Sequence, residues 1–158
     1  IVPPLADALD LPHANPEIVY VGDDPALGQY RKDFANAVYL LEERMPTGYE
    51  KSDNTLKSQR KVEEDNDIHF NQKLVLRARL LDFIVGDWDR HEDNWRWLKL
   101  EDKKGDKEYV PVPRDRDKVF FKSSGIFPWI LSHQWLNAKH QPYEPNIRAV
   151  TQWNFYQR

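Results

Sequence analysis

Residues 86–94, which read GDWDRHEDN, decide how the rest of the chain is interpreted. This polar stretch follows an apolar run at residues 80–85 (LLDFIV) that is typical of the end of a buried helix. A second acidic stretch, PRDRDKVFF at residues 113–121, comes after an interval that is typical of two strands joined by a turn. A hairpin in this interval would bring the two acidic loops together at one end. Carboxylate and amide ligands suit Mg²⁺ or Mn²⁺ better than zinc, so the pattern predicts a divalent-cation site there.

The composition narrows the class of protein. With 158 residues the chain fits one domain or one lobe of a larger protein. The net charge of -3 gives no basic field, so we expect no nucleic acid partner. The absence of cysteine excludes disulfides and cysteine-ligated zinc, and no apolar run is long enough to span a bilayer. Because the chain begins without Met and ends in an aromatic stretch, we expect a piece of a longer polypeptide with partners missing on its N-terminal side.

The local patterns predict a mixture of helices and strands. In chain order we expect a short helix near residues 5–9, a strand at 17–21, a strand or a short helix at 37–44, helices at 54–64 and 68–85, hairpin strands at 95–100 and 108–112 around a turn at 102–106, and a helix at 127–138. The helix at 54–64 is expected to be capped by Ser52 or Asp53. The helix at 68–85 is expected to be the core element, with a broad apolar surface that Asp82 interrupts. In the last helix we expect Trp129 and its apolar neighbours to pack inward.

The two acidic loops have the arrangement that phosphoryl transfer uses. An Asp follows a helix, an Asn comes five residues later, and a further Asp follows a hairpin. In that chemistry one carboxylate orients the attacking hydroxyl or accepts its proton. The amide and the other carboxylate hold the metal ions that neutralise the charge on the phosphates.

The same residues carry a resemblance to a kinase superfamily. DRHEDN at residues 89–94 resembles the catalytic loop of phosphoinositide 3- and 4-kinases and of HipA-like protein kinases, and DRDKVF at residues 115–120 resembles their metal-binding loop, with spore-coat kinases of the CotH type closer still. The resemblance implies an ATP- and Mg²⁺- or Mn²⁺-dependent phosphotransferase. Its implied catalytic-loop residues are Asp89 as the catalytic Asp, with Arg90 and His91 bracing the loop, the His through a hydrogen bond to backbone. Its implied cofactor and metal ligands are Asn94 and Asp115, with Asp117 as a further metal ligand.

A longer resemblance covers most of the chain. The phrases GDWDRHEDNWRW and VPRDRDKVFF, together with residues 19–44, are similar to an uncharacterised kinase-like region in large envelope proteins of Bacteroidetes. This similarity implies a place in the cell envelope. The expected partners are a nucleotide, a phosphate acceptor that the sequence does not identify, and the missing N-terminal lobe of the same polypeptide.

The expected fold is therefore α+β, a mainly helical kinase-like C-lobe with a hairpin between the catalytic and metal loops. Residues 1–45 would form a hinge-proximal helix and strands, and residues 46–158 the core of the lobe. No Gly-rich phosphate loop and no strand Lys with a partner Glu can be identified before the catalytic loop, so this chain alone is not expected to transfer phosphate.

Two other interpretations remain open. One is a non-catalytic pseudokinase or a structural or interaction domain of a larger envelope protein, and the other is a different metal enzyme that uses the Asp115-x-Asp117 pair, such as a nuclease or a glycosyltransferase. Catalytic acids must converge on a solvent-open cleft. Structural acids would instead be paired with the arginines of these loops and the adjoining strand, at positions 90, 96, 114 and 116.

Overall fold

The computed structural model describes residues 2–43, 45, 48–49, 51–101, 105–122, 124–132 and 140–147. These residues form a small mixed α+β protein with two sheets. Two compact units can be distinguished, a smaller one within residues 14–50 and a larger one that contains the rest of the described chain. The sequence placed a division at residue 45, whereas in the structure the smaller unit extends to about residue 50 and residues 2–13 belong to the larger unit.

The smaller unit is built on a two-stranded antiparallel sheet. β1 (Glu17–Val21) and β2 (Ala37–Leu41) pair along their full length. Between them lie the 3₁₀ helix η1 (Pro25–Tyr30) and the short helix α2 (Arg31–Phe34). The β-branched and aromatic residues of both segments favour strands, and of the two alternatives left open for the second segment the structure shows a strand, over residues 37–41.

The larger unit contains a three-stranded sheet. Its strands are β3 (Ile68–Phe70), β5 (Lys107–Pro113) and β4 (Trp95–Glu101), in that spatial order. β5 runs antiparallel to β4 and parallel to β3. The predicted hairpin is confirmed, although residues 102–104 of its predicted turn lie outside the described residues.

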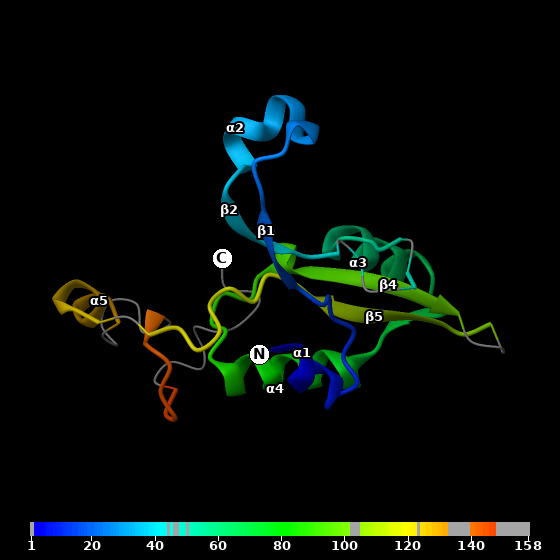
Figure 1. The fold of residues 1–158 in the computed structure, drawn as a ribbon. Helices are drawn as coiled ribbons and strands as arrows, with labels where there is room; N and C mark the ends of the chain where they lie inside the picture. The colour runs from blue at the N-terminus through cyan, green and yellow to red at the C-terminus, as the bar shows by residue number, and fades with distance from the viewer. Residues whose placement is uncertain are drawn as a thin grey trace. The chain divides into compact units, whose positions relative to one another are not determined.

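Helix α4 (Gln72–Val85) packs against β5, and α1 (Val2–Asp7) lies beside α4 (Figure 1). The prediction that this helix begins at residue 68 was wrong, because residues 68–70 form β3. The side chain of Asn71 accepts a hydrogen bond from the Leu74 N–H at 2.8 Å and caps the helix. The strand and the cap together move the start of the helix by four residues.

Helix α3 (Thr55–Glu64) has a different cap from the one predicted. Asn54, rather than Ser52 or Asp53, accepts a hydrogen bond from the Lys57 N–H at 2.8 Å. Asp53 instead forms a single β-bridge with Trp97. Its backbone is therefore part of the sheet edge, and its side chain pairs with Lys57 and Lys61.

The core of the larger unit combines one face of α4 with aromatic residues of the sheet. Its buried apolar members are Ala6, Leu11, Ile68, Ala78, Leu81, Val85, Trp95, Trp97 and Tyr109. The apolar surface of α4 is narrower than predicted, since Leu76, Leu80 and Ile84 are half or more exposed. Asp82 is fully buried, so it belongs to the interior face of the helix.

Helix α5 (Ile126–Leu131) is shorter and more exposed than predicted. Trp129 and Leu131, which were expected to pack inward, are 63% and 52% exposed, and Phe127 is 80% exposed. A helix of six residues projects side chains in every direction, so a single contact surface cannot bury all of its large apolar groups. Residues 133–138 of the predicted helix lie outside the described residues.

Candidate active site

Helix α4 ends at Gly86, whose φ of 73° and ψ of 29° lie in the left-handed region. The Gly86 N–H donates to the carbonyls of Asp82 and Phe83 and so closes the helix. A Cβ at this position would lie 2.8 Å from Cδ2 of Tyr143, so both the space and the backbone conformation require glycine. The chain therefore turns sharply out of α4 into residues 87–94.

The base of the β4–β5 hairpin joins the two acidic loops. Trp95 is paired with Pro113 at this end of the hairpin. The Arg114 N–H donates to the Asn94 carbonyl across 2.9 Å. The 3₁₀ helix η2 (Glu92–Asn94) completes the first loop immediately before β4. The loops meet as the sequence predicts, because the strand register places residue 94 next to residue 114.

Arg90 lies at the centre of the junction and is fully buried, with a side-chain exposure of 0%. Its Nε and Nη2 donate to the two carboxylate oxygens of Asp82 at 3.0 and 3.1 Å, and Nη2 also donates to Asp87 at 2.6 Å. Its Nη1 donates to the carbonyl of Asn94 at 3.1 Å and to that of Arg114. All five N–H groups of a guanidinium are used in this way. Arg90 thus holds both loops and the end of α4, which is the bracing position that the resemblance implies.

Asp82, Arg79 and Arg116 extend this network. None of the three was among the predicted site residues. Arg79 donates to Asp82 at 2.8 Å, and Nη2 of Arg116 lies 3.1 Å from the same carboxylate. Asp82 therefore faces three guanidinium groups, from α4 and from both loops. One sequence signal points to it, because residue 82 follows Ala78 by four positions and precedes Val85 by three, which places it on the buried face of the helix.

Burial shifts the pKa of three members of this network, Asp87, Arg79 and Arg116. It raises the pKa of Asp87 to about 6, against the opposing effect of the Arg90 charge. It also lowers the pKa of the Arg79 and Arg116 guanidinium groups, against the attraction of Asp82. The cluster is thus a desolvated group of charges whose members need each other to remain buried.

The predicted acids lie outside this buried network. Asp89 is partly buried, and Asp115 and Asp117 are exposed. Asp117 forms an ion pair with Lys118. Within the described part of the chain, neither Asp89 nor Asp115 forms an ion pair with an arginine. The arginines at positions 90 and 116 bind Asp82 and Asp87 instead.

Lys118 reports that the predicted acids lie near one another. Its pKa is raised, first by the hydrogen bond to Asp117 and further by the charges of Asp117, Asp89 and Asp115. One ammonium group therefore experiences the carboxylates of both loops.

Asn94 and His91 differ in how they are held. Asn94 is 6% exposed, and its Nδ2 donates to the Asp89 carbonyl at 3.0 Å. No described residue donates to Oδ1 of Asn94, so this oxygen is available to a cation. Nδ1 of His91 is buried without a hydrogen-bond partner and lies 3.9 Å from Asp93. The expected hydrogen bond from His91 to backbone does not occur among the described residues.

The second loop has an unusual backbone. Asp115 and Phe120 have φ values of 53° and 54°, which lie in the left-handed region. Residues other than glycine adopt this conformation at a cost of about 1–3 kcal/mol. The Phe120 N–H donates to the Val85 carbonyl at 2.8 Å, and its ring packs edge-on against Tyr143 at 4.9 Å. These contacts hold the far end of the loop against α4.

The available ligands suit a cation that is bound together with a phosphate group. Among the described residues, no three His, Asp or Glu side chains are close enough to hold a metal ion by themselves. Mg²⁺ in phosphate-transfer enzymes is bound by one or two carboxylates, with phosphate oxygens and water as its other ligands. An open amide oxygen on Asn94 and an exposed carboxylate on Asp115 fit this pattern.

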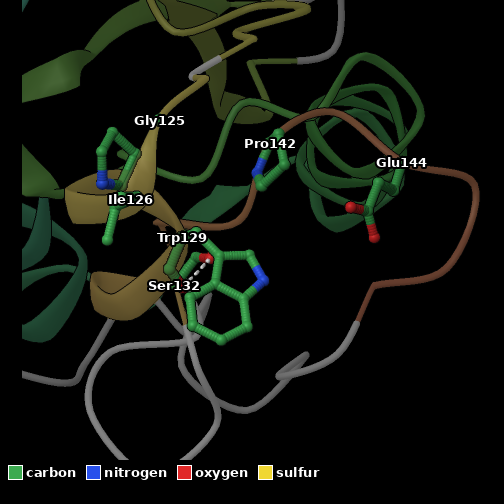
Figure 2. A pocket seen from close by; sticks show the side chains of 7 residues that line it. Gly125, Ile126, Trp129, Ser132, Pro142 and Glu144 are labelled. Carbon is green, nitrogen blue, oxygen red and sulfur yellow. Dashed lines mark hydrogen bonds between the residues drawn. The ribbon is translucent and has the colours of Figure 1, made fainter.

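A pocket of about 550 Å³ lies beside helix α5 (Figure 2). It is lined by Gly125, Ile126, Pro128, Trp129, Ser132, Pro142 and Glu144. Ser132 donates its hydroxyl to the Trp129 carbonyl at 3.0 Å, so this polar group is already engaged. None of the predicted catalytic or metal-binding residues lines the pocket.

No protein-family model, curated protein or solved structure matches the chain. None of the helices in the described ranges combines the length and the apolar character that a bilayer span needs.

Proposed function

We propose that this chain is a kinase-like lobe that uses ATP with Mg²⁺ or Mn²⁺ for phosphate transfer. The observation that carries the proposal is the hydrogen bond from the Arg114 N–H to the Asn94 carbonyl, which joins the loop of Asn94 to the loop of Asp115. The raised pKa of Lys118, to which the charges of Asp117, Asp89 and Asp115 contribute, supports it. Neither Asp89 nor Asp115 has an arginine partner among the described residues, and a carboxylate without one is available to a cation.

Each predicted residue has a role in this proposal. Asp89 orients the acceptor hydroxyl and takes its proton, while Asn94 and Asp115 would hold the cation, with Asp117 as a further ligand. When bound, the cation would neutralise charge on the transferred phosphate. Arg90 is a positioning residue, because its fully buried guanidinium contacts only protein groups. His91 packs in the same loop and has no assigned role in proton transfer.

The test is the affinity of the chain for Mn²⁺ in the presence of ATP, measured by electron paramagnetic resonance. Asp115→Ala and Asn94→Ala should each weaken binding about tenfold or more, because each removes an oxygen ligand. Asp89→Ala should retain binding. Asp67→Ala is the matched control, since Asp67 is an exposed acid of the same unit with no side-chain ion pair in the described structure. Equal affinity in the wild type and in Asp115→Ala would refute the proposal.

Transfer of the γ-phosphate from labelled ATP to protein, lipid and small-molecule acceptors is the second readout, measured on a polypeptide extended toward the N-terminus, because this chain alone is not expected to transfer phosphate. Turnover that is lost in Asp89→Ala, while Mn²⁺ and ATP still bind, would assign the catalytic role. Binding without any transfer would favour a pseudokinase.

An interaction domain is the second candidate, and exposed apolar side chains favour it. In the smaller unit one face of the β1–β2 sheet carries Ile18, Tyr20, Val38 and Leu40, each 64–80% exposed. Solvent exposure on this scale is typical of a surface that binds a partner. Concentration-dependent association that Leu40→Ser abolishes, combined with no binding of Mn²⁺ and ATP, would favour this candidate over the kinase.

A further inference from the structure

Arg116 lies between two of the predicted metal ligands and points the opposite way. Asp115 and Asp117, its neighbours, are exposed, whereas the Arg116 side chain is only 11% exposed. The loop therefore alternates, with acids outward and the guanidinium inward. Any force that fixes Arg116 also fixes the backbone from which both acids project.

Asp82 supplies that force. Nη2 of Arg116 lies 3.1 Å from Oδ1 of Asp82, and this is the only carboxylate with which Arg116 forms an ion pair in the described part of the chain. Neither Nη1 nor Nη2 of Arg116 makes a hydrogen bond of good geometry, although both are buried. Attraction to Asp82 is therefore the main interaction that keeps this guanidinium inside.

The charge balance makes the Arg116 position unusual. Three guanidinium groups, of Arg79, Arg90 and Arg116, share the two carboxylates of Asp82 and Asp87. The cluster thus has an excess positive charge close to the site proposed for a cation. Simple electrostatics predicts that this charge weakens cation binding. Its presence there needs a compensating benefit, and the geometry of the loop offers one.

We propose that Arg116 and Asp82 are positioning residues that tie residues 114–117 to the end of α4 and so orient Asp115 and Asp117 for a divalent cation. The cation part of this inference rests on the proposed function. The tie itself rests only on the buried ion pair between the second loop and the helix. Arg90 holds the first loop to the same carboxylate, so Asp82 sets the separation of the two loops.

The sign of one affinity change tests the inference. Arg116→Met should weaken Mn²⁺ binding, measured with ATP by electron paramagnetic resonance, about tenfold or more, as the loss of an outer-shell partner does at metal sites. Arg116→Lys should recover part of the loss, because a cation can still reach Asp82. Arg96→Met, which removes a positive charge from β4 without touching Asp82, is the control. Tighter binding in Arg116→Met would show a purely electrostatic effect and would overturn the inference.

A double-mutant cycle tests whether Asp82 and Arg116 act as a pair. Adding Arg116→Met to Asp82→Asn should weaken binding less than it does in the wild type, since the partner is already altered. Independent effects would contradict the pairing. If Asp82→Asn does not fold, the comparison of Arg116→Met with Arg116→Lys tests the pairing instead. The first variant removes the positive charge that faces Asp82, and the second keeps it.

Hydrogen exchange separates this inference from the proposed function. Absence of Mn²⁺ binding in the wild type would refute the proposed cation site but would leave the tie testable. Exchange of the amides of residues 115–118 should then be faster in Arg116→Met than in the wild type, with α3 unchanged. Unchanged exchange in this loop would overturn the tie, whatever the metal result.

Discussion

Two networks of the larger unit stabilise carboxylates that are partly or fully buried, and they use different cations to do so. Asp53 accepts hydrogen bonds from the Nζ of Lys61 at 2.7 Å and the Tyr109 hydroxyl at 2.6 Å, and it pairs with Lys57 at 2.7 Å. Its lysine partners are 36–59% exposed. The Asp82 and Asp87 network uses arginines that are at most 16% exposed.

The two networks have opposite effects on their acids. Burial pushes the pKa of Asp53 upward, but hydrogen bonds from Lys57, Lys61 and Tyr109 outweigh it and hold the pKa well below its usual range. At Asp87 burial outweighs Arg90, and the pKa is raised. The lysine network near the surface therefore contributes stability. The arginine network costs desolvation energy and gains position, because planar guanidinium groups connect several segments at fixed geometry.

The largest effect is expected for Arg90→Met. It removes five hydrogen bonds and leaves two buried carboxylates short of a partner, so the free energy of unfolding should fall by about 3–5 kcal/mol. Urea unfolding measures this loss. Arg96→Met is the control and should change stability by less than about 1 kcal/mol, since Arg96 has no ion pair in the described structure. A similar small loss in Arg90→Met would mean that the network is not needed for folding.

A pH series sharpens the contrast at Asp87. Its folded pKa of about 6 lies above the ordinary value of 3.8, so the folded state binds the proton more tightly than the unfolded state. The contribution of Asp87 to the free energy of unfolding is therefore fully present below about pH 3.8 and is lost as the pH rises through 6, by at most about 3 kcal/mol. The stability of the wild type minus that of Asp87→Asn should fall over this range in urea titrations. If the stability difference between the wild type and Asp87→Asn instead rose with pH, the pKa of Asp87 would be lowered in the folded state rather than raised.

Asp53 should show the opposite trend with a smaller amplitude. Its lowered pKa means that the folded state releases the proton more readily, so its contribution is present at pH 7 and is lost as the pH falls below 4. Asp53→Asn should cost about 1–2 kcal/mol at pH 7, and less at pH 3, in thermal or urea unfolding. Lys57→Met, which removes the more exposed lysine partner, should cost about 0.5 kcal/mol. A cost for Asp53→Asn that is independent of pH would contradict the pairing.

Local patterns predicted the parts of the fold that depend on neighbouring residues. Alternation of apolar and polar residues located the β4–β5 hairpin, and the apolar run before Gly86 located the end of α4. The start of α4 was missed because the apolar residues of β3 also fit helical spacing. Only pairing with β5, distant in sequence, makes residues 68–70 a strand.

In the candidate site, too, local features of the sequence were predictable and contacts between distant residues were not. The acids at positions 89, 115 and 117 and Asn94 could be named as candidates because their types and spacing are local features. The roles of Asp82 and Arg116 were not found, since an ion pair over 34 positions depends on how the loop and the helix meet. A charged residue at helical spacing from buried apolar residues was the one available signal for Asp82.

The register of β4 with β5 has a practical consequence for engineering. Seven consecutive residue pairs, from Trp95 with Pro113 to Glu101 with Lys107, separate the acidic loops from the far end of the hairpin. At about 3.4 Å per residue, this ladder keeps the far end roughly 20 Å from the junction. An affinity tag or a fluorescent reporter spliced between Glu101 and Lys107 should leave the arrangement of the two loops at the base undisturbed.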